Sequence, residues 1–367
     1  MTTESLKTIQ NAIAKEGLDW QAAATSVSQL SADQQKEMLG LRVEKAELDA
    51  TEKAIKAASA LSALQAEAGF PLAIDWRNNG GNWTTPIKNQ GGCGSCVAHG
   101  TLATIEARAS IVCQNPNLDL DLSESHLFYC GCGNCCGNGW NFAPALDFCK
   151  NTGVAKEADF PYVDSNQPCK PGVVPMFKID GWSQVLALAD RKNLLAARGP
   201  MVAGMAVYQD FFSYSGGVYQ HVSGSLAGYH AISVVGYNET DKYWICKNSW
   251  GTGWGELGPD GSRGWFRIAY GDASGLDTQF AFYDVQLNQC PVPVIDPCLK
   301  HRIYLSSVLS AAQTNRALRA CLLFHVCRVG RLTLCSSAVM AVVSRVQAVL
   351  KVCPQFRAAF CRALQAT

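Results

Sequence analysis

The cysteines of this chain are spread very unevenly, and their placement constrains the fold more than any other feature. The sequence holds 17 cysteines, none of them within residues 1–92 and six of them within residues 298–367. A content this high is typical of proteins in an oxidising compartment, where cysteines pair as disulfides. Because the number is odd, at least one cysteine is expected to stay outside the intrachain pairs.

Charged residues divide the chain into three parts. Residues 1–70 carry 7 basic and 10 acidic side chains, residues 71–297 carry 14 and 20, and residues 298–367 carry 10 and none. The overall net charge of +1 therefore conceals an acidic body and a strongly basic tail. A break of this size predicts three domains with these boundaries. The charge of the whole chain does not favour a nucleic-acid partner, whereas the tail suits an anionic surface or polymer.

Residues 1–69 have the composition of a helical segment. Leu, Ala, Glu, Gln and Lys dominate there, and all of them favour helices. Ser31-Ala-Asp-Gln34 is a capping pattern that predicts the start of a helix running through Leu41. A second amphipathic helix is predicted over Lys45–Ala66.

The sequence offers no recognisable targeting segment. The stretch from Met1 to Trp20 lacks the charged and then apolar run of a signal peptide. The longest apolar run, Leu334–Val343, has about half the length of a membrane span, so no transmembrane segment is predicted. The cysteine content favours a secreted or lysosome-like compartment, and the route to it stays open at this point.

The middle part, residues 71–297, has the pattern of a mixed α+β domain. A helix of small and apolar residues is predicted over Ser95–Val112. Strands are predicted later in the chain, over His230–Tyr237, Tyr243–Cys246 and Trp265–Ala269. Helices first and strands later indicate the α+β class.

The tail is again predicted to be helical. Apolar residues recur at three- and four-residue spacing over Ala312–Val329, Ser336–Val352 and Pro354–Leu364, with arginines between them. Its six cysteines suit a disulfide-stapled module that binds anionic surfaces. Docking on the acidic body and a mistranslated origin are two other interpretations, and the sequence favours none of the three.

The strongest chemical signal is the segment Asn89-Gln-Gly-Gly-Cys-Gly-Ser-Cys-Val97. Cys96 opens the predicted helix, and a helix N-terminus favours the thiolate form of a cysteine. Gln90 can donate a side-chain N–H to a developing oxyanion. A thiolate nucleophile needs a base and a group that orients the base. His230 and Asn248 follow Cys96 by 134 and 152 residues, which predicts a Cys–His–Asn set.

Further motifs surround these residues in a fixed order. They are Asp75-Trp-Arg77, Asp121-Leu-Ser-Glu124, Gly153-Val with Phe160-Pro-Tyr162, Gly216-Gly-Val-Tyr219 and Lys247-Asn-Ser-Trp-Gly-Thr-Gly-Trp-Gly-Glu256. With them, the stretch 71–290 resembles a papain-family cysteine protease. The resemblance implies a two-lobed α+β fold, with a helical left lobe, a β-barrel right lobe and the active cleft between them. It implies a hydrolase, a thiol endopeptidase that cleaves polypeptides through a thioester acyl-enzyme without a cofactor or metal.

The resemblance also assigns roles to single residues. It implies that Cys96 is the nucleophile, that His230 is the base and ion-pair partner, and that Asn248 orients the imidazole. Gln90 and the backbone N–H of Cys96 would form the oxyanion hole. The residues that it places against substrate are Gly137, Asn138, Gly139, Trp140 and Tyr229, with Phe142 as an alternative to Trp140, while Trp250 would shield the bond between His230 and Asn248.

Disulfides follow from the same resemblance. It implies the pairs Cys93–Cys136 and Cys130–Cys169, both beside the nucleophile. Cys113–Cys149 is a candidate for a further pair. The run Cys130-Gly-Cys-Gly-Asn-Cys-Cys136 also fits half of a zinc site, although no second half lies at the usual spacing. Cys246, in a predicted strand, is expected to be a buried free thiol.

The sequence departs from the family at two positions behind the nucleophile. The family has Trp and Phe where this chain has Val97 and His99. His99 is an alternative base, but a packed role in the core is the favoured interpretation. His126 is expected on a helix surface and His221 in a solvent-facing loop.

Three functions remain open from the sequence. They are an endopeptidase made as an inactive precursor, a non-catalytic papain-fold binding protein, and an exopeptidase with one cleft end blocked. The complete Cys–His–Asn set favours the first, and no clear insertion supports the third. Residues 1–70 have the size of a papain-type propeptide but lack its usual Phe and Asn pattern, so an unrelated helical domain is the other interpretation.

Overall fold

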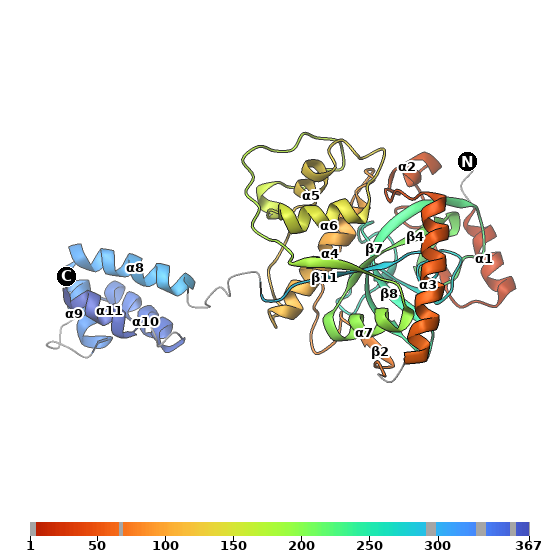
Figure 1. The fold of residues 1–367 in the computed structure, drawn as a ribbon. Helices are drawn as coiled ribbons and strands as arrows, with labels where there is room; N and C mark the ends of the chain where they lie inside the picture. Colours follow the sequence, from red (N-terminus) through yellow and green to blue (C-terminus); the bar gives the residue numbers. More distant parts are fainter. Residues whose placement is uncertain (1–4, 66–68, 291–298, 328–334, 353–356, 367) are drawn as a thin grey trace. The chain divides into compact units, whose positions relative to one another are not determined.

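The computed structural model describes residues 5–65, 69–290, 299–327, 335–352 and 357–366 (Figure 1). They form two compact units, Met1–Pro291 and Val292–Thr367, which are described one at a time. The first unit confirms the predicted α+β class. Within the described residues, no helix has the length and apolar character of a membrane span.

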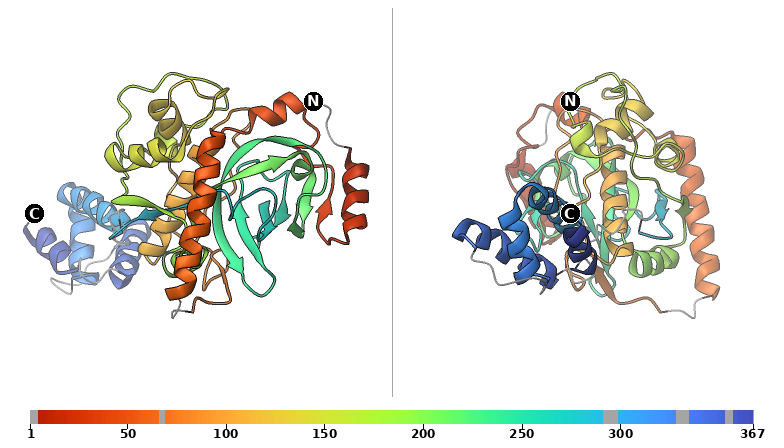
Figure 2. Two further views of the ribbon diagram at one scale, coloured as in Figure 1. Left: turned by 45° about the vertical axis from the view of Figure 1, so that its right-hand side comes forward. Right: turned by 90° about the vertical axis from the view of Figure 1, so that its left-hand side faces the viewer.

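The N-terminal segment contributes three helices and a short strand to the first unit. They are α1 (Leu6–Glu16), β1 (Gln21–Ala22), α2 (Ala32–Glu37) and α3 (Lys45–Gln65). The predicted capping box is present at α2, where Ser31 and Gln34 cap each other. Helix α3, the long orange helix of Figure 2, runs along the outside of the unit.

Helix α2 is shorter than predicted. It ends at Glu37, so the expected continuation through Leu41 is wrong. The backbone of Leu41 and Arg42 forms hydrogen bonds with Tyr229 and Trp140 instead of helical ones. Tertiary pairing with distant segments has here overridden a local helical preference.

The helical lobe is built around α4 (Cys96–Val112), almost all of which is buried. Helices α5 (Glu124–Gly131) and α6 (Phe142–Asn151) pack on α4 and on each other, and a short 3-10 helix, η1 (Glu157–Asp159), follows. Gly100 allows α4 to lie directly against the sheet, because a Cβ there would sit 3.3 Å from the backbone of Ile232.

The second lobe is a nine-stranded sheet with the path β3-β11-β4-β7-β8-β10-β6. Strand β2 pairs with β7 at one side and β9 pairs with β10, while β1 and β5 form a separate pair. The bounds are β2 (Ala73–Asp75), β3 (Gly181–Val185), β4 (Met201–Tyr208), β5 (Tyr214–Gly216), β6 (Val218–Tyr219), β7 (Leu226–Asn238), β8 (Tyr243–Lys247), β9 (Glu256–Leu257), β10 (Arg263–Ala269) and β11 (Phe282–Gln286), with α7 (Leu188–Arg198) and η2 (Gln209–Ser213) between them.

The long central strand β7 positions the site. It pairs antiparallel with both β4 and β8, and α4 packs across it. The core beneath it is apolar and aromatic, and Trp244, Trp254 and Phe266 are fully buried there. Burial of each of these large side chains contributes about 2–3 kcal/mol to the free energy of unfolding, so the sheet that carries β7 is well packed.

The described residues of the second unit form four helices, α8 (Leu299–Thr314), α9 (Arg316–His325), α10 (Ser337–Val352) and α11 (Arg357–Ala366). The single helix predicted over Ala312–Val329 is wrong, because the side chain of Asn315 accepts the N–H of Leu318 and starts a new helix. The disulfides Cys321–Cys335 and Cys327–Cys361 staple the unit. Cys298 and Cys353 lie outside the described residues.

Candidate active site

Cys96 is the first residue of α4 and is fully buried. Burial raises the pKa of its thiol to about 11, and backbone N–H groups, led by that of Ala231 and then that of Gly40, oppose the rise. Ala231 adjoins His230 on β7. The start of α4 and the middle of β7 therefore bring the predicted nucleophile and the predicted base to the same place.

The imidazole of His230 is held by one strong hydrogen bond. Its Nε2 lies 2.8 Å from Oδ1 of Asn248, an acceptor, so this nitrogen carries the proton and donates. The ring of Trp250 covers the imidazole, with ring centroids 4.8 Å apart. Burial lowers the pKa of His230 to about 4, although the hydrogen bond to Asn248 raises it. Nδ1 makes no hydrogen bond of good geometry, although the backbone of Met38 lies near enough to the ring to raise its pKa.

The side-chain amide of Gln90 donates hydrogen bonds to two backbone carbonyl groups. Its Nε2 donates to the carbonyl of Met38 and to that of Cys93, both at 2.9 Å. Its Oε1 accepts from the hydroxyl of Ser249 at 2.6 Å, which fixes the orientation of the amide. The group implied as an oxyanion donor thus faces the N-terminal segment.

The segment Met38–Arg42 leaves α2 in a helical turn at Met38 and then crosses the site, with one isolated β-bridge between Leu41 and Trp140. The N–H of Trp140 donates to the carbonyl of Gly40 at 2.7 Å, and the N–H of Arg42 donates to the carbonyl of Trp140 at 3.0 Å. The N–H of Leu41 donates to the carbonyl of Tyr229 at 3.2 Å. Two other parts of the same chain, around Trp140 and Tyr229, therefore hold the segment from opposite sides.

Gly40 fits against the start of α4 only because it has no side chain. A Cβ at Gly40 would lie 1.8 Å from the carbonyl oxygen of Gly94, and a Cβ at Gly139 would lie 2.0 Å from the carbonyl oxygen of Gly40. Three glycine backbones thus meet beside Cys96. No sequence motif predicts this contact, and its only local signal is a glycine between Leu39 and Leu41.

The side chain of Leu41 fills an apolar site between the lobes. A Cβ on Gly204 would lie 2.6 Å from the Leu41 side chain and 2.6 Å from the ring of Phe280. A cavity of about 400 Å³ continues from Leu41 past Phe280 to Phe142, which the sequence analysis had placed near substrate. Gly204 and Phe280 were missed, because no local motif marks them.

The comparisons with known proteins agree with this geometry. The family model described as papain family cysteine protease matches residues 70–283, more than half of the chain. The chain belongs to the papain family of cysteine proteases.

Curated relatives support the same family. Zingipain-2 of Zingiber officinale is 38% identical over 217 residues, which cover 54% of this papain-family chain and 95% of that protein. Cysteine proteinase 1 of Entamoeba histolytica is 35% identical over 203 residues, which cover 51% of this chain and 62% of that protein. The match thus spans less than two thirds of the amoebal relative.

Solved proenzyme structures match more of this papain-family chain than the family model does. The procathepsin L2 proteinase of the Tenebrio molitor larval midgut matches with a TM-score of 0.59 and 27% identity, over 77% of this chain and 90% of that chain. The procathepsin B S9 of Trypanosoma congolense matches with a TM-score of 0.62 and 22% identity, over 77% and 98% of the two chains, and shows the fold.

The substrate-contact residues implied by the sequence fall into two groups in this papain-family protease. Gly139, Trp140 and Tyr229 lie along the segment Met38–Arg42, and the carbonyl of Asn138 accepts from the Arg42 side chain at 2.8 Å. Gly137 is exposed with nothing within 4 Å of a Cβ there, and Trp250 lies on His230 as expected.

His99 points into the helical lobe of the protease. Its Nδ1 lies 3.2 Å from the carbonyl oxygen of Ser95, and its ring meets that of Tyr162 edge-on at 4.7 Å. Burial lowers the pKa of His99 to about 3, which keeps the ring neutral. Packing of this kind fits the core role expected for His99.

Two other histidines lie elsewhere than expected. His126 is not on a surface but is buried, and its Nδ1 accepts the N–H of Ala155 at 3.3 Å. His221 is not free in solvent, because its Nδ1 lies 3.1 Å from the buried carboxylate of Asp210. A buried carboxylate is unfavourable without hydrogen-bond partners, and His221 is one of the partners of Asp210.

The disulfides correct two expectations. The structure contains Cys93–Cys136 and Cys130–Cys169, the two pairs that the resemblance implies. Cys113 pairs with Cys290 rather than Cys149, because the end of α4 faces the last part of the unit and Cys149 is a buried free thiol. Cys132 pairs with Cys135, so all four sulfurs of the suggested zinc run are in disulfides and none is available as a thiolate ligand. Cys246 is buried and free.

Proposed function

We propose that this chain is the latent precursor of a cysteine endopeptidase, with Cys96, His230, Asn248 and Gln90 as its catalytic residues and residues 1–70 as the segment that masks them. Its substrates are polypeptides, as the family implies. The tail from Cys298 onward takes no part in the chemistry.

The observation that carries this proposal is the carbonyl of Met38 on the side-chain amide of Gln90, at 2.9 Å. A donor that will stabilise an oxyanion must point to where a peptide carbonyl lies beside the nucleophile. Here a peptide carbonyl occupies that position, yet the segment that carries it is part of the same chain. The contact accounts both for the catalytic assignment and for latency.

The geometry supports an acyl-enzyme mechanism once the segment has left. A substrate strand would take the backbone groups of Trp140 and Tyr229 that now hold residues 40–42. The Cys96 sulfur attacks the scissile carbonyl while Nδ1 of His230 takes the thiol proton. Gln90 Nε2 and the Cys96 N–H stabilise the oxyanion, the amine leaves with the proton from His230, and water then hydrolyses the thioester.

Burial under the segment keeps the pair inactive. The pKa of Cys96 is raised to about 11 and that of His230 is lowered to about 4, and desolvation is the largest cause of both shifts. A neutral thiol beside a neutral imidazole is therefore the stable state of the covered site at pH 7. Entry of water relaxes both shifts and favours the thiolate and imidazolium forms.

Three substitutions test the catalytic assignment. Cys96→Ala should abolish peptide hydrolysis, and His230→Ala should reduce kcat by at least about a thousandfold, because nucleophile and base act as one unit. His99→Ala should keep a substantial fraction of the activity, since His99 contacts Ser95 and Tyr162. Steady-state hydrolysis of a small peptide by the processed proteins measures all three. If His99→Ala abolishes turnover while His230→Ala spares it, the assignment is wrong.

A further inference from the structure

One of the four disulfides of the first unit closes almost no loop. Cys132 and Cys135 are bonded across a sequence separation of 3, whereas the bond between Cys93 and Cys136 spans a separation of 43. A disulfide stabilises a fold mainly by restricting the unfolded chain, and the effect grows with the length of the loop. Stability therefore explains the Cys132–Cys135 bond least of all.

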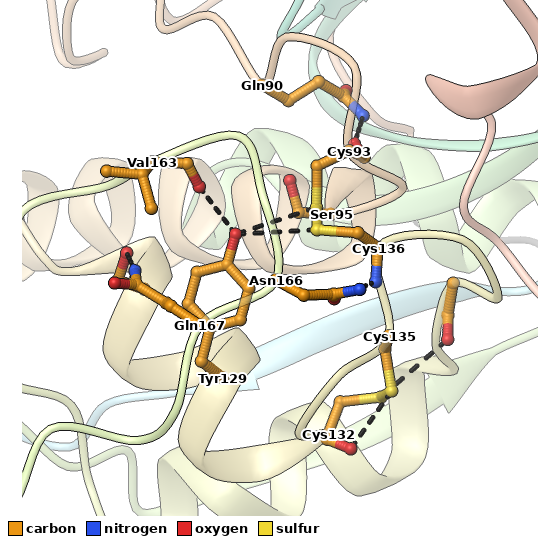
Figure 3. The surroundings of a disulfide bond; sticks show 12 residues. Gln90, Cys93, Ser95, Tyr129, Cys132, Cys135, Cys136, Val163, Asn166 and Gln167 are labelled. Carbon is orange, nitrogen blue, oxygen red and sulfur yellow. Dashed lines mark hydrogen bonds between the residues drawn. A yellow bond between two sulfur atoms is a disulfide. The ribbon is translucent and has the colours of Figure 1, made fainter.

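This bond shapes the turn that leads into the cleft (Figure 3). The carbonyl of Cys135 accepts the N–H of Asn138 at 3.0 Å and that of Gly139 at 2.7 Å. The sulfur of Cys132 lies 3.8 Å from the carbonyl oxygen of Gly139. The cross-link thus fixes the position from which the chain enters Trp140.

The same turn provides the backbone groups that hold a chain in the cleft. Trp140 gives its N–H to Gly40 and accepts from Arg42, and Asn138 accepts from the Arg42 side chain. These groups form a strand-like contact, in which alignment of donor and acceptor sets the strength. A change in the turn will therefore alter how tightly a peptide is held, while Cys96 and His230 lie on other elements.

Of the two cysteines, Cys132 is the less buried. The Cys132 side chain is half-buried, and its neighbours Gly131 and Asn134 are exposed, while Cys135 is buried. Two cysteines separated by two residues form the Cys-X-X-Cys spacing, which can lower the pKa of a thiol, and a thiol of low pKa leaves faster in thiol–disulfide exchange. Attack is therefore expected at Cys132, with Cys135 as the leaving thiolate.

We propose that the Cys132–Cys135 disulfide is a redox site through which an external dithiol changes the affinity of the cleft for substrate. A thiolate of the dithiol attacks the Cys132 sulfur, the bond between the two cysteines breaks, and Cys135 takes a proton from water. The second thiol of the reductant then attacks the mixed disulfide and releases Cys132. The protein gains two electrons and two protons, and the dithiol leaves as a disulfide.

The first test needs no enzymatic activity. The oxidised full chain is equilibrated with graded mixtures of reduced and oxidised dithiothreitol, alkylated and mapped by mass spectrometry. Cys132 and Cys135 should become alkylated together in mixtures where Cys93 and Cys136 are still bonded. Reduction of Cys93–Cys136 first, or of both bonds together, would overturn the proposal.

The second test rests on the proposed peptidase function. The processed Cys132→Ser/Cys135→Ser enzyme should show a KM raised about fivefold and a kcat within about twofold of the wild type. Wild-type enzyme reduced and alkylated only at these two cysteines should behave in the same way, which guards against a folding defect of the variant. Cys321→Ser/Cys335→Ser, in the second unit, is the matched control and should leave both constants unchanged.

The two tests fail in distinguishable ways. An unchanged KM in both the serine variant and the alkylated enzyme overturns the link between the disulfide and the cleft. A wild-type protein whose disulfides reduce in the expected order, but which never cleaves a peptide after processing, overturns the peptidase function and leaves the redox site standing.

Discussion

His230 shows how one buried residue makes the site sensitive to acid. Its pKa falls from the usual 6.5 to about 4 because burial disfavours the imidazolium. In Cys96→Ala, where no thiolate can stabilise the imidazolium, the ring is neutral above pH 6.5 whether the site is covered or open, so pH has no effect through it. Between pH 6.5 and 4 an uncovered ring binds a proton that the covered ring does not, so acid favours the open state. Each pH unit in this window contributes at most about 1.4 kcal/mol.

Hydrogen exchange tests this linkage in the Cys96→Ala full chain, which cannot process itself. The opening free energy of the Leu41 and Arg42 amides, corrected for intrinsic exchange rates, should fall as pH drops from 6.5 to 4 and level off below. The same measurement in Cys96→Ala/His230→Gln should lose most of this dependence. A dependence that survives the second substitution would assign the effect to other groups.

The placement of the proposed catalytic residues agrees with the sequence motifs, while their chemical roles stay a prediction. The positions of Cys96, His230 and Asn248 depend on local motifs, each of which sits at the end or the middle of a strong helix or strand. His126 was placed wrongly, because a single histidine gives no periodic signal and its burial depends on the contact with Ala155. Long-range contacts of this kind leave no local trace.

At the scale of elements, the proposed mask depends on the segment Met38–Arg42, which lies against the start of α4. Its fit depends on Gly40, where a Cβ would meet the backbone of Gly94 at 1.8 Å. The backbones of Gly94 and Gly139 face Gly40 and cannot move without disturbing the surrounding structure. A methyl group on Gly40 should therefore displace the segment from the start of α4. Gly40, in the middle of the segment, is therefore the position where the proposed mask is most sensitive to a small change.

Gly40→Ala should weaken latency. We expect the full chain with this substitution to react with a cleft-directed epoxide at Cys96 at least about tenfold faster than the wild type, which corresponds to about 1.4 kcal/mol of lost masking. Gly69→Ala is the matched control, because a Cβ at Gly69 meets nothing within 4 Å. Equal labelling rates for the two variants would show that Gly40 does not hold the mask.

Elements were predicted well where local pattern and packing agree. The helix expected over Ser95–Val112 is present as α4, and β7, β8 and β10 include the three strands that were expected. The prediction failed at the end of α2 and at Asn315. In both places a specific hydrogen bond, to a distant strand or from a capping side chain, outweighs helical propensity.

At the scale of the whole molecule, the C-terminal unit is compact in its own right. It has its own core, which includes Leu322, Val343 and Leu364, and its own disulfides. Residues 298–367 contain no acidic side chain. The basic side chains exposed on its described helices are Arg316, Arg345, Lys351, Arg357 and Arg362. Attraction to an anionic surface is the interaction that such a composition favours.

Deletion of residues 298–367 should leave kcat/KM for small peptides within about threefold, since surface charge contacts contribute only about 1 kcal/mol. Binding of the intact protein to anionic vesicles should be lost on deletion. It should also weaken with salt as the Debye length falls below about 8 Å. A truncated enzyme that folds and keeps its disulfides, yet cannot cleave a small peptide, would show that the tail completes the site.

The pairing of Cys113 with Cys290 shows why the long-range organisation was only partly predictable. The two residues are separated by 177 positions, and nothing in the composition near Cys113 distinguishes Cys290 from Cys149. The segment Met38–Arg42 is a similar case, because its partners Trp140 and Tyr229 lie far along the chain. Both contacts depend on the assembled lobes rather than on any segment.

The central claim is that Cys96 is a catalytic thiol masked by the N-terminal segment, and epoxide labelling with peptide mapping tests it most directly. The full chain is labelled before processing, and again after residues 1–70 have been removed at acid pH. We expect slow labelling of Cys96 before residues 1–70 are removed, and rapid labelling of Cys96 alone afterwards. Equal labelling in the two states would contradict the mask, and an unlabelled Cys96 after removal would contradict the catalytic assignment.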